Sequence, residues 1–327
     1  QCLATENADG TFSKIGPVLP LPEGYTGHVR DPKVWRHEDR WYMVLGAQDR
    51  QKCGKVLLFS SADLSQWTNE GEIAGAGING LHDAGYMWEC PDLFPLGDQH
   101  ILICCPQGIT REKERYLNTY PAVWMAGGFD YASAAFTHGE LHELDAGFEF
   151  YAPQTMQTTD GRRLLVGWMG VPDGEEMRQP TRANGWIHQM TCLRELEWVD
   201  GKLYQRPLRE LSALRGEVRG WQGNVLPLAP LEIALDTAGD DAFSLDFGGA
   251  LTLERDTRGL RLARRSLASD DMLYRYWRGE VRSLRIFVDR SSVEIFINDG
   301  EGVMSSRLFP DYPAQLIFSG ATPVTFC

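Results

Sequence analysis

The stretch VLLFSSADLSQW, residues 56–67, carries the pattern that decides the fold. An apolar run is followed by a polar turn and then by Trp67, which opens the next strand. Short apolar runs bounded by turn-forming residues are typical of β-strands. The preceding residues repeat this pattern, because the run WYMVL at 41–45 follows a polar turn at 37–40. Successive hairpins of this kind predict the four-stranded antiparallel blades of a β-propeller, although a generic β-sandwich would show the same pattern.

A second region of short alternating strands begins near residue 216 and predicts a β-sandwich. Between the two regions, leucines recur at helical spacing after Pro207, so a linker helix is expected over residues 205–215. The chain is therefore expected to be all-β apart from this helix. Its predicted domains are a propeller over residues 1–204 and a C-terminal sandwich over residues 216–327.

The charge of the chain limits its partners. A formal net charge of -13 over 327 residues argues against nucleic acid and anionic membrane surfaces. Residues 251–290 are an exception, with ten Arg against six acidic residues. Because these arginines alternate with acids along the predicted strands, we expect them on solvated strand faces, with a nucleic-acid patch as the alternative.

Seven cysteines are scattered along the chain without a Cys-x-x-Cys pair. This spacing predicts neither a disulfide framework nor a zinc site. Reduced thiols fit a cytoplasmic protein best. No apolar run in the sequence approaches the roughly 20 residues of a membrane-spanning helix.

Two carboxylates stand in segments that suit acid–base chemistry. Glu89 lies between Trp88 and Cys90 in a largely apolar segment, where burial would raise its pKa as a general acid requires. Asp31 is preceded by Arg30, which is expected to keep it ionised. Such a pair is expected where glycosidic bonds are cleaved. Each also has a structural alternative, a turn with a local ion pair for Asp31 and a satisfied hydrogen-bond acceptor for Glu89.

The segments around both carboxylates resemble sequence signatures of glycoside hydrolase family 32, the invertases and fructan hydrolases. Arg30-Asp31-Pro32 resembles the signature of the transition-state stabiliser, and WECPD at 88–92 resembles that of the acid/base residue. Three further blocks match in the same order along the chain. They are FYAPQ at 150–154, GWM at 167–169 and LRIFVDRSSVEIF at 284–296.

The resemblance implies a five-bladed propeller followed by a β-sandwich. It also implies a retaining glycosidase that releases fructose from sucrose or sucrose 6-phosphate, without a metal or organic cofactor. Glu89 would be the acid/base residue, and Asp31 would bind sugar hydroxyls in the transition state. The side chains expected to contact substrate are Arg30, Cys90, Tyr151 and Trp168. A small sugar is the only partner expected, and homo-oligomerisation stays open.

One part of the family pattern has no match in this sequence. The family's nucleophile is an Asp in a segment like WMNDPNG near the N-terminus, and no such segment occurs here. We expect that an N-terminal part with the first blade and the nucleophile is missing, and that the chain as written is inactive. A non-catalytic or vestigial sugar-binding homologue is the alternative. A third hypothesis is another five-bladed glycosidase that uses an inverting pair of carboxylates.

Overall fold

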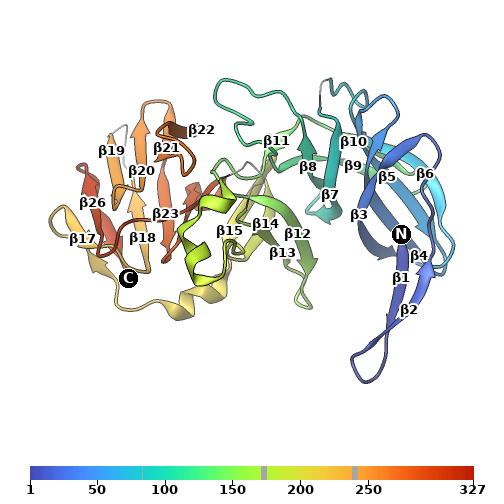
Figure 1. The fold of residues 1–327 in the computed structure, drawn as a ribbon, viewed down its shortest axis with the longest axis horizontal. Coiled ribbons are helices and arrows are strands. Elements are labelled where there is room, and N and C mark those ends of the chain that lie inside the picture. The colour runs from blue at the N-terminus through green and yellow to red at the C-terminus, as the bar shows by residue number, and fades with distance from the viewer. Residues whose placement is uncertain (83, 171–174, 238–241) are drawn as a thin grey trace. The chain divides into compact units, whose positions relative to one another are not determined.

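The computed structural model describes residues 1–327 except 83, 171–174 and 238–241 (Figure 1). The described residues form antiparallel β-sheets, and the helices among them are short 3-10 segments, which confirms the all-β prediction. Within the same residues, no helix is long and apolar enough to cross a membrane.

The chain divides into two compact units. Unit 1 comprises Gln1–Thr110 and Tyr120–His142, and unit 2 comprises Arg111–Thr119 and Glu143–Cys327. Each unit is described by itself below. The predicted domain boundaries near residues 204 and 216 remain a proposal.

Unit 1 consists of a hairpin and two larger sheets. The hairpin pairs β1 (Cys2–Glu6) with β2 (Phe12–Pro17). The next sheet has the order β3-β4-β5-β6, with β3 (Tyr25–His37), β4 (Arg40–Asp49), β5 (Gly54–Ser61) and β6 (Thr68–Gly75). The other has the order β10-β9-β8-β7, with β11 also on β9. Its strands are β7 (Met87–Leu96), β8 (Gln99–Gln107), β9 (Val123–Asp130), β10 (Ala135–His138) and β11 (His142–Glu143).

The two larger sheets of unit 1 are built from strands that are consecutive in the chain, as in propeller blades. Strand β5 lies inside its sheet and is buried along its whole length. This burial explains why residues 56–59 form an unbroken apolar run instead of an alternating one.

Unit 2 begins with a third sheet of four consecutive strands. Its order is β12-β13-β14-β15, with β12 (Tyr151–Gln157), β13 (Arg163–Trp168), β14 (Arg194–Val199) and β15 (Lys202–Pro207). Two 3-10 helices, η1 (Glu176–Arg178) and η2 (Pro180–Asn184), lie between β13 and β14 in the sequence.

The rest of unit 2 contains two six-stranded sheets. One has the order β16-β27-β18-β23-β24-β25. Its strands are β16 (Arg219–Gly220), β18 (Leu231–Asp236), β23 (Ser283–Val288), β24 (Ser292–Ile297), β25 (Gly302–Arg307) and β27 (Val324–Phe326), and η4 (Asn298–Gly300) joins β24 to β25. The other has the order β17-β26-β19-β20-β21-β22. Its strands are β17 (Val225–Pro227), β19 (Phe243–Phe247), β20 (Leu251–Asp256), β21 (Gly259–Arg265), β22 (Met272–Arg278) and β26 (Gln315–Ser319).

Both six-stranded sheets contribute to one apolar core. Ile233 and Ile286 come from the first sheet and Leu245 and Leu262 from the second, and all four are fully buried in the same cluster. Alternate residues of β19 point into this core, as expected for strands with one buried face. Two sheets that share a core in this way form the β-sandwich predicted for this part of the chain.

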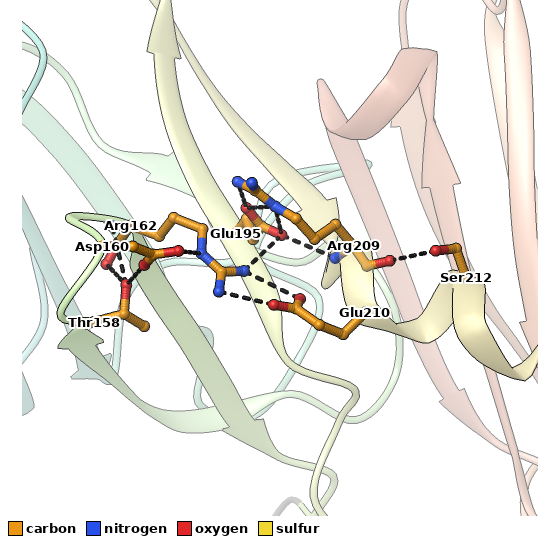
Figure 2. A network of polar contacts seen from close by, with 7 residues as sticks. All are labelled: Thr158, Asp160, Arg162, Glu195, Arg209, Glu210 and Ser212. Carbon is orange, nitrogen blue, oxygen red and sulfur yellow. Dashed lines mark hydrogen bonds and ion pairs between the residues drawn. The ribbon is translucent and has the colours of Figure 1, made fainter.

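The predicted linker helix differs from the structure. Strand β15 continues to Pro207, and only Arg209–Leu214 is helical, as the 3-10 helix η3. Ion pairs hold its first turn against the third sheet, since Arg209 pairs with Glu195 at 2.6 Å and Glu210 pairs with Arg162 at 2.8 Å (Figure 2). The leucine spacing indicated a helix correctly, but strand pairing competes for its N-terminal residues.

Some arginines of the region 251–290 form ion pairs with carboxylates, although solvated strand faces were expected for them. Arg264 is buried and forms an ion pair of 2.5 Å with Glu149. Arg278 pairs with Glu114 at 2.7 Å, and this bond lowers the pKa of Glu114 to about 2. The expectation of solvated faces is therefore wrong for Arg264. The charged loop around Glu114 is likewise bound to the sandwich sheet through Arg278.

Candidate active site

The first strands of the three blade-like sheets, β3, β7 and β12, share one irregularity. In each, two residues face a single residue of the neighbouring strand, which is a β-bulge. The first bulged residue has a positive φ of 64°, 49° or 46°, and a proline follows it. The bulges are at Arg30-Asp31-Pro32, Glu89-Cys90-Pro91 and Tyr151-Ala152-Pro153. Such backbone is uncommon for residues other than glycine and marks candidate functional positions.

The bulges place the predicted site residues at equivalent positions. Arg30, Glu89 and Tyr151 directly precede the three bulges, while Asp31 and Cys90 are the first bulged residues of their strands. Because a bulge re-aims the side chains beside it, the same backbone feature orients a different side chain in each sheet.

In unit 1, contacts between β3 and β7 bring both predicted catalytic carboxylates together. The backbone N–H of Cys90 donates a hydrogen bond of 3.0 Å to Asp31 Oδ2. Arg30 reaches across in the same way, and its Nε and Nη2 donate to Glu89 Oε1 at 2.8 and 2.6 Å. Each carboxylate is thus held by a group of the neighbouring sheet's bulge.

These contacts correct two expectations. Arg30 pairs with Glu89, whereas it was expected to hold Asp31. The surroundings of the Glu89 oxygen atoms are polar, although an apolar pocket was expected from Trp88 and the neighbouring residues. The indole of Trp88 is indeed buried, but its N–H donates to the carbonyl of Ala84 at 2.7 Å and the ring packs inside the unit. A side chain and its sequence neighbour point to opposite faces of a strand, so the apolar neighbours do not surround the carboxylate.

Gln107 is a contact of Glu89 that the sequence analysis missed. It ends β8, and its Nε2 donates a hydrogen bond of 2.7 Å to Glu89 Oε2. With Arg30 on Oε1, both oxygens of the Glu89 carboxylate have a donor. The only signal in the sequence was a polar residue at the end of an apolar run, which is too common to be informative.

Tyr86 also belongs to the surroundings of Glu89. Its hydrogen bond with Tyr120, together with partial burial, raises the pKa of Tyr86 to about 12, and the charge of Glu89 adds to this shift. The phenol therefore remains protonated at neutral pH and can act as a hydrogen-bond donor or acceptor.

An ion pair with a buried carboxylate and a partly exposed lysine follows the bulges of β3 and β7. Lys33 Nζ lies 3.0 Å from Asp92 Oδ2, and the carboxylate is 1% exposed. Gly46, opposite Arg30 in the register, permits the close approach of the two sheets here, because a Cβ at this position would collide with the carbonyl oxygen of Trp88. The spacing of the two bulges is therefore fixed by charge and by backbone contact.

The two aromatic residues expected to contact substrate lie in unit 2. Tyr151 and Trp168 are paired in register on β12 and β13, and their rings meet edge to face at 6.4 Å. Trp168 also contacts the His188 ring at 4.8 Å. The structure thus brings these two residues together within their unit, as it does Arg30 and Glu89 in the other.

The metal-binding capacity of the described residues is small. Among them, no group of three or more His, Cys, Asp or Glu side chains is arranged to hold a metal ion. All seven cysteines are free thiols, including Cys90 beside Asp31.

Comparisons with known proteins show which family the chain resembles. The chain matches the family models described as the Glycosyl hydrolases family 32 N-terminal domain over residues 1–207 and the Glycosyl hydrolases family 32 C terminal over residues 250–325. It is 83% identical to the sucrose-6-phosphate hydrolase of Salmonella typhimurium, over 100% of this chain and 70% of that relative.

Solved structures of similar fold were also found. A Bombyx mori β-fructofuranosidase of glycoside hydrolase family 32, a mutant in complex with sucrose, is 32% identical with a TM-score of 0.86, over 99% of this chain and 71% of that one. The sucrose-6-phosphate hydrolase from Lactobacillus gasseri is 27% identical, with the same TM-score of 0.86 and the same coverage of 99% and 71%.

Proposed function

Because this chain belongs to glycoside hydrolase family 32, we propose that it acts as a β-fructofuranosidase that releases fructose from sucrose or sucrose 6-phosphate. The observation that carries the proposal is the 83% identity over the whole chain with a sucrose-6-phosphate hydrolase. This similarity does not favour the non-catalytic, sugar-binding alternative. The protein is thus a glycosidase whose substrate is a small sugar.

Glu89 is the proposed acid/base residue. In a retaining glycosidase, one carboxyl group protonates the leaving oxygen and then deprotonates the attacking water. Arg30 and Gln107 bind the two oxygens of Glu89 and fix the direction in which the carboxyl group faces. A group held in position before the substrate arrives loses little entropy in the transition state.

Asp31 is the proposed stabiliser of the transition state. A carboxylate that binds sugar hydroxyls most strongly when positive charge develops on the ring lowers the barrier. The Cys90 amide at 3.0 Å occupies one lone pair of Asp31 Oδ2 and leaves the other oxygen for a hydroxyl. Arg30, Cys90, Tyr151 and Trp168 are the proposed substrate contacts.

Retention requires a nucleophile in addition to these residues. The resemblance to the family assigns this role to an aspartate in a segment without a match among the 327 residues. We propose that the three blade-like sheets belong to a five-bladed propeller whose first blade supplies that segment. We also propose that the protein works in the cytoplasm, where its thiols stay reduced.

The test separates proton donation from binding in the native protein. Glu89→Gln should lose most turnover on sucrose, by about a hundredfold or more, yet keep its rate on a fructoside whose leaving group needs no proton. Glu72→Gln is the matched control, since Glu72 is a carboxylate of the same unit that pairs with Lys55 at 3.1 Å. Equal losses on both substrates would refute the assignment of Glu89 as the acid.

A further inference from the structure

A pocket lies within unit 2, and none of the proposed catalytic residues lines it. It has a volume of about 530 Å³ and is formed by η2, the turn after β23 and the segment after β25. Cavities that bind small ligands commonly measure roughly 300–1,000 Å³. The pocket is thus large enough for a mono- or disaccharide.

Two exposed aromatic side chains line this pocket. Trp186 is 42% exposed and Tyr312 is 52% exposed, although aromatic rings of this size usually lie in the core. The Trp186 ring is not loose, because the guanidinium of Arg307 stacks on it at 5.4 Å and donates to Ser291 and Ile187. A rigid, exposed aromatic face is suited to the apolar C–H face of a sugar ring.

A buried hydroxyl that has no partner among the described residues also belongs to the lining of the pocket. Thr181 is 8% exposed and lines the pocket, and its Oγ1 makes no hydrogen bond to any described residue. A buried hydroxyl without a hydrogen bond costs free energy, which a bond to a ligand would recover. A hydroxyl can both donate and accept, which fits the hydroxyl groups of a sugar.

The charges of the lining decide against an anionic ligand. Asp289 and Asp311 contribute two carboxylates and Arg290 one guanidinium. The donors of nearby Arg307 already bind protein oxygens. A phosphate would therefore meet more negative than positive charge, whereas carboxylates and amides readily bind neutral hydroxyl groups.

From these observations we propose that the pocket of Thr181, Trp186 and Tyr312 is a second saccharide site that binds a neutral mono- or disaccharide. Trp186 and Tyr312 contact the sugar ring, and Thr181 bonds a hydroxyl. Trp186 and Gln189 line this pocket, while His188 between them contacts Trp168. The second site therefore adjoins the segment that supports a proposed substrate contact. The inference goes beyond the proposed function and does not depend on it, since it uses none of the catalytic residues.

The test is calorimetric titration of the native protein carrying Glu89→Gln, so that sucrose is not consumed. Sucrose, fructose and glucose 6-phosphate are titrated separately, and the neutral sugars should show a class of binding that glucose 6-phosphate lacks. Tyr312→Ala should weaken this class at least tenfold. Thr181→Val, which keeps the shape but not the hydroxyl, should weaken it about threefold to tenfold. Tyr274→Ala is the matched control, because Tyr274 is an exposed tyrosine on β22 outside the pocket.

The outcomes are distinct. Loss of one class of sites in Tyr312→Ala and Thr181→Val, with Tyr274→Ala unchanged, supports the second site. An isotherm that both pocket variants leave unaltered overturns it, as does equal binding of glucose 6-phosphate at the affected site. Hydrolysis of sucrose by the same variants with Glu89 restored is measured in parallel, so a failure of the proposed hydrolase function is seen separately. Melting temperatures near that of the parent protein show that the variants are folded.

Discussion

Arg194 gives the sharpest test of how unit 2 is held together. Its guanidinium is 0% exposed and lies 2.9 Å from Asp145 Oδ2 and 3.1 Å from Glu294 Oε2. It also donates to Gln205 and Ser305 and stacks on Phe150 at 4.6 Å. These partners come from the third sheet, from the sandwich and from the segment just before β12, so one cation joins several parts of the unit.

Replacing Arg194 by Met keeps an apolar side chain of similar length and removes the charge. Two buried carboxylates then lose their counterion, and removing one partner of a buried ion pair costs about 3–5 kcal/mol. For a unit of this size 1 kcal/mol corresponds to roughly 2–4 °C, so the melting temperature should fall by roughly 6–20 °C. Burial raises the pKa of Glu294, and loss of Arg194 removes a charge that opposes this shift. Protonation of Glu294 should therefore reduce the loss of stability, so the fall in melting temperature should be smaller at pH 5 than at pH 8.

The assay is thermal unfolding followed by circular dichroism at both pH values, with Arg209→Met as control. Arg209 is 65% exposed and pairs with Glu195 at 2.6 Å (Figure 2). An exposed pair contributes about 0–1 kcal/mol, so the control should lose only a few degrees. A decrease in melting temperature of less than about 2 °C for Arg194→Met, or equal decreases for both variants, would refute the reasoning.

Three further predictions concern individual carboxylates and their partners. Asp31→Asn should lower turnover on sucrose about 100- to 1,000-fold with little change in melting temperature, whereas a grossly unfolded variant would support a structural role. Gln107→Leu removes a 2.7 Å bond to Glu89 and should lower kcat/KM about tenfold to hundredfold; an unchanged pH–rate profile would contradict a positioning role. Burial raises the pKa of Glu143 from 4.5 to about 7, so the folded state binds the proton more tightly and stability falls as pH rises between these values. Glu143→Gln lacks this titration, so its free energy of unfolding should rise by about 3 kcal/mol relative to that of the parent protein between pH 4.5 and pH 8. Denaturant unfolding measures both values, and a difference that does not change with pH would exclude the effect.

The sequence predicted those features that depend on local pattern. Residues 56–67 predicted strands and hairpins correctly, because burial on one or both faces leaves a readable period. Asp31 and Glu89 were named because their segments suit acid–base chemistry. Arg30 and Cys90 were named as substrate contacts from the resemblance to the family.

What could not be predicted depends on contacts between distant segments. Arg30 was assigned to its sequence neighbour Asp31, but the bulge turns it toward Glu89, 59 residues away. Gln107 carries no local signal of its contact with Glu89. The start of η3 was misplaced because pairing of β15 with β14 competes with helical spacing near Pro207. Sheet register sets the contact of Gln107 and the pairing of β15, whereas Arg30 meets Glu89 through contact between two sheets, and a single sequence reveals neither.

The repeated bulge separates where a functional group is held from what that group is. One backbone kink, specified by a left-handed residue and a proline, occurs three times, and it carries a carboxylate at Asp31, a thiol at Cys90 and only a methyl group at Ala152. The backbone of the bulge therefore keeps the same conformation while the side chain at its first position differs widely in chemistry. Changes in specificity in such a protein need not alter its strands or turns. They can arise by exchange of single side chains at the bulge positions. The fold and the chemistry of the site can then vary independently.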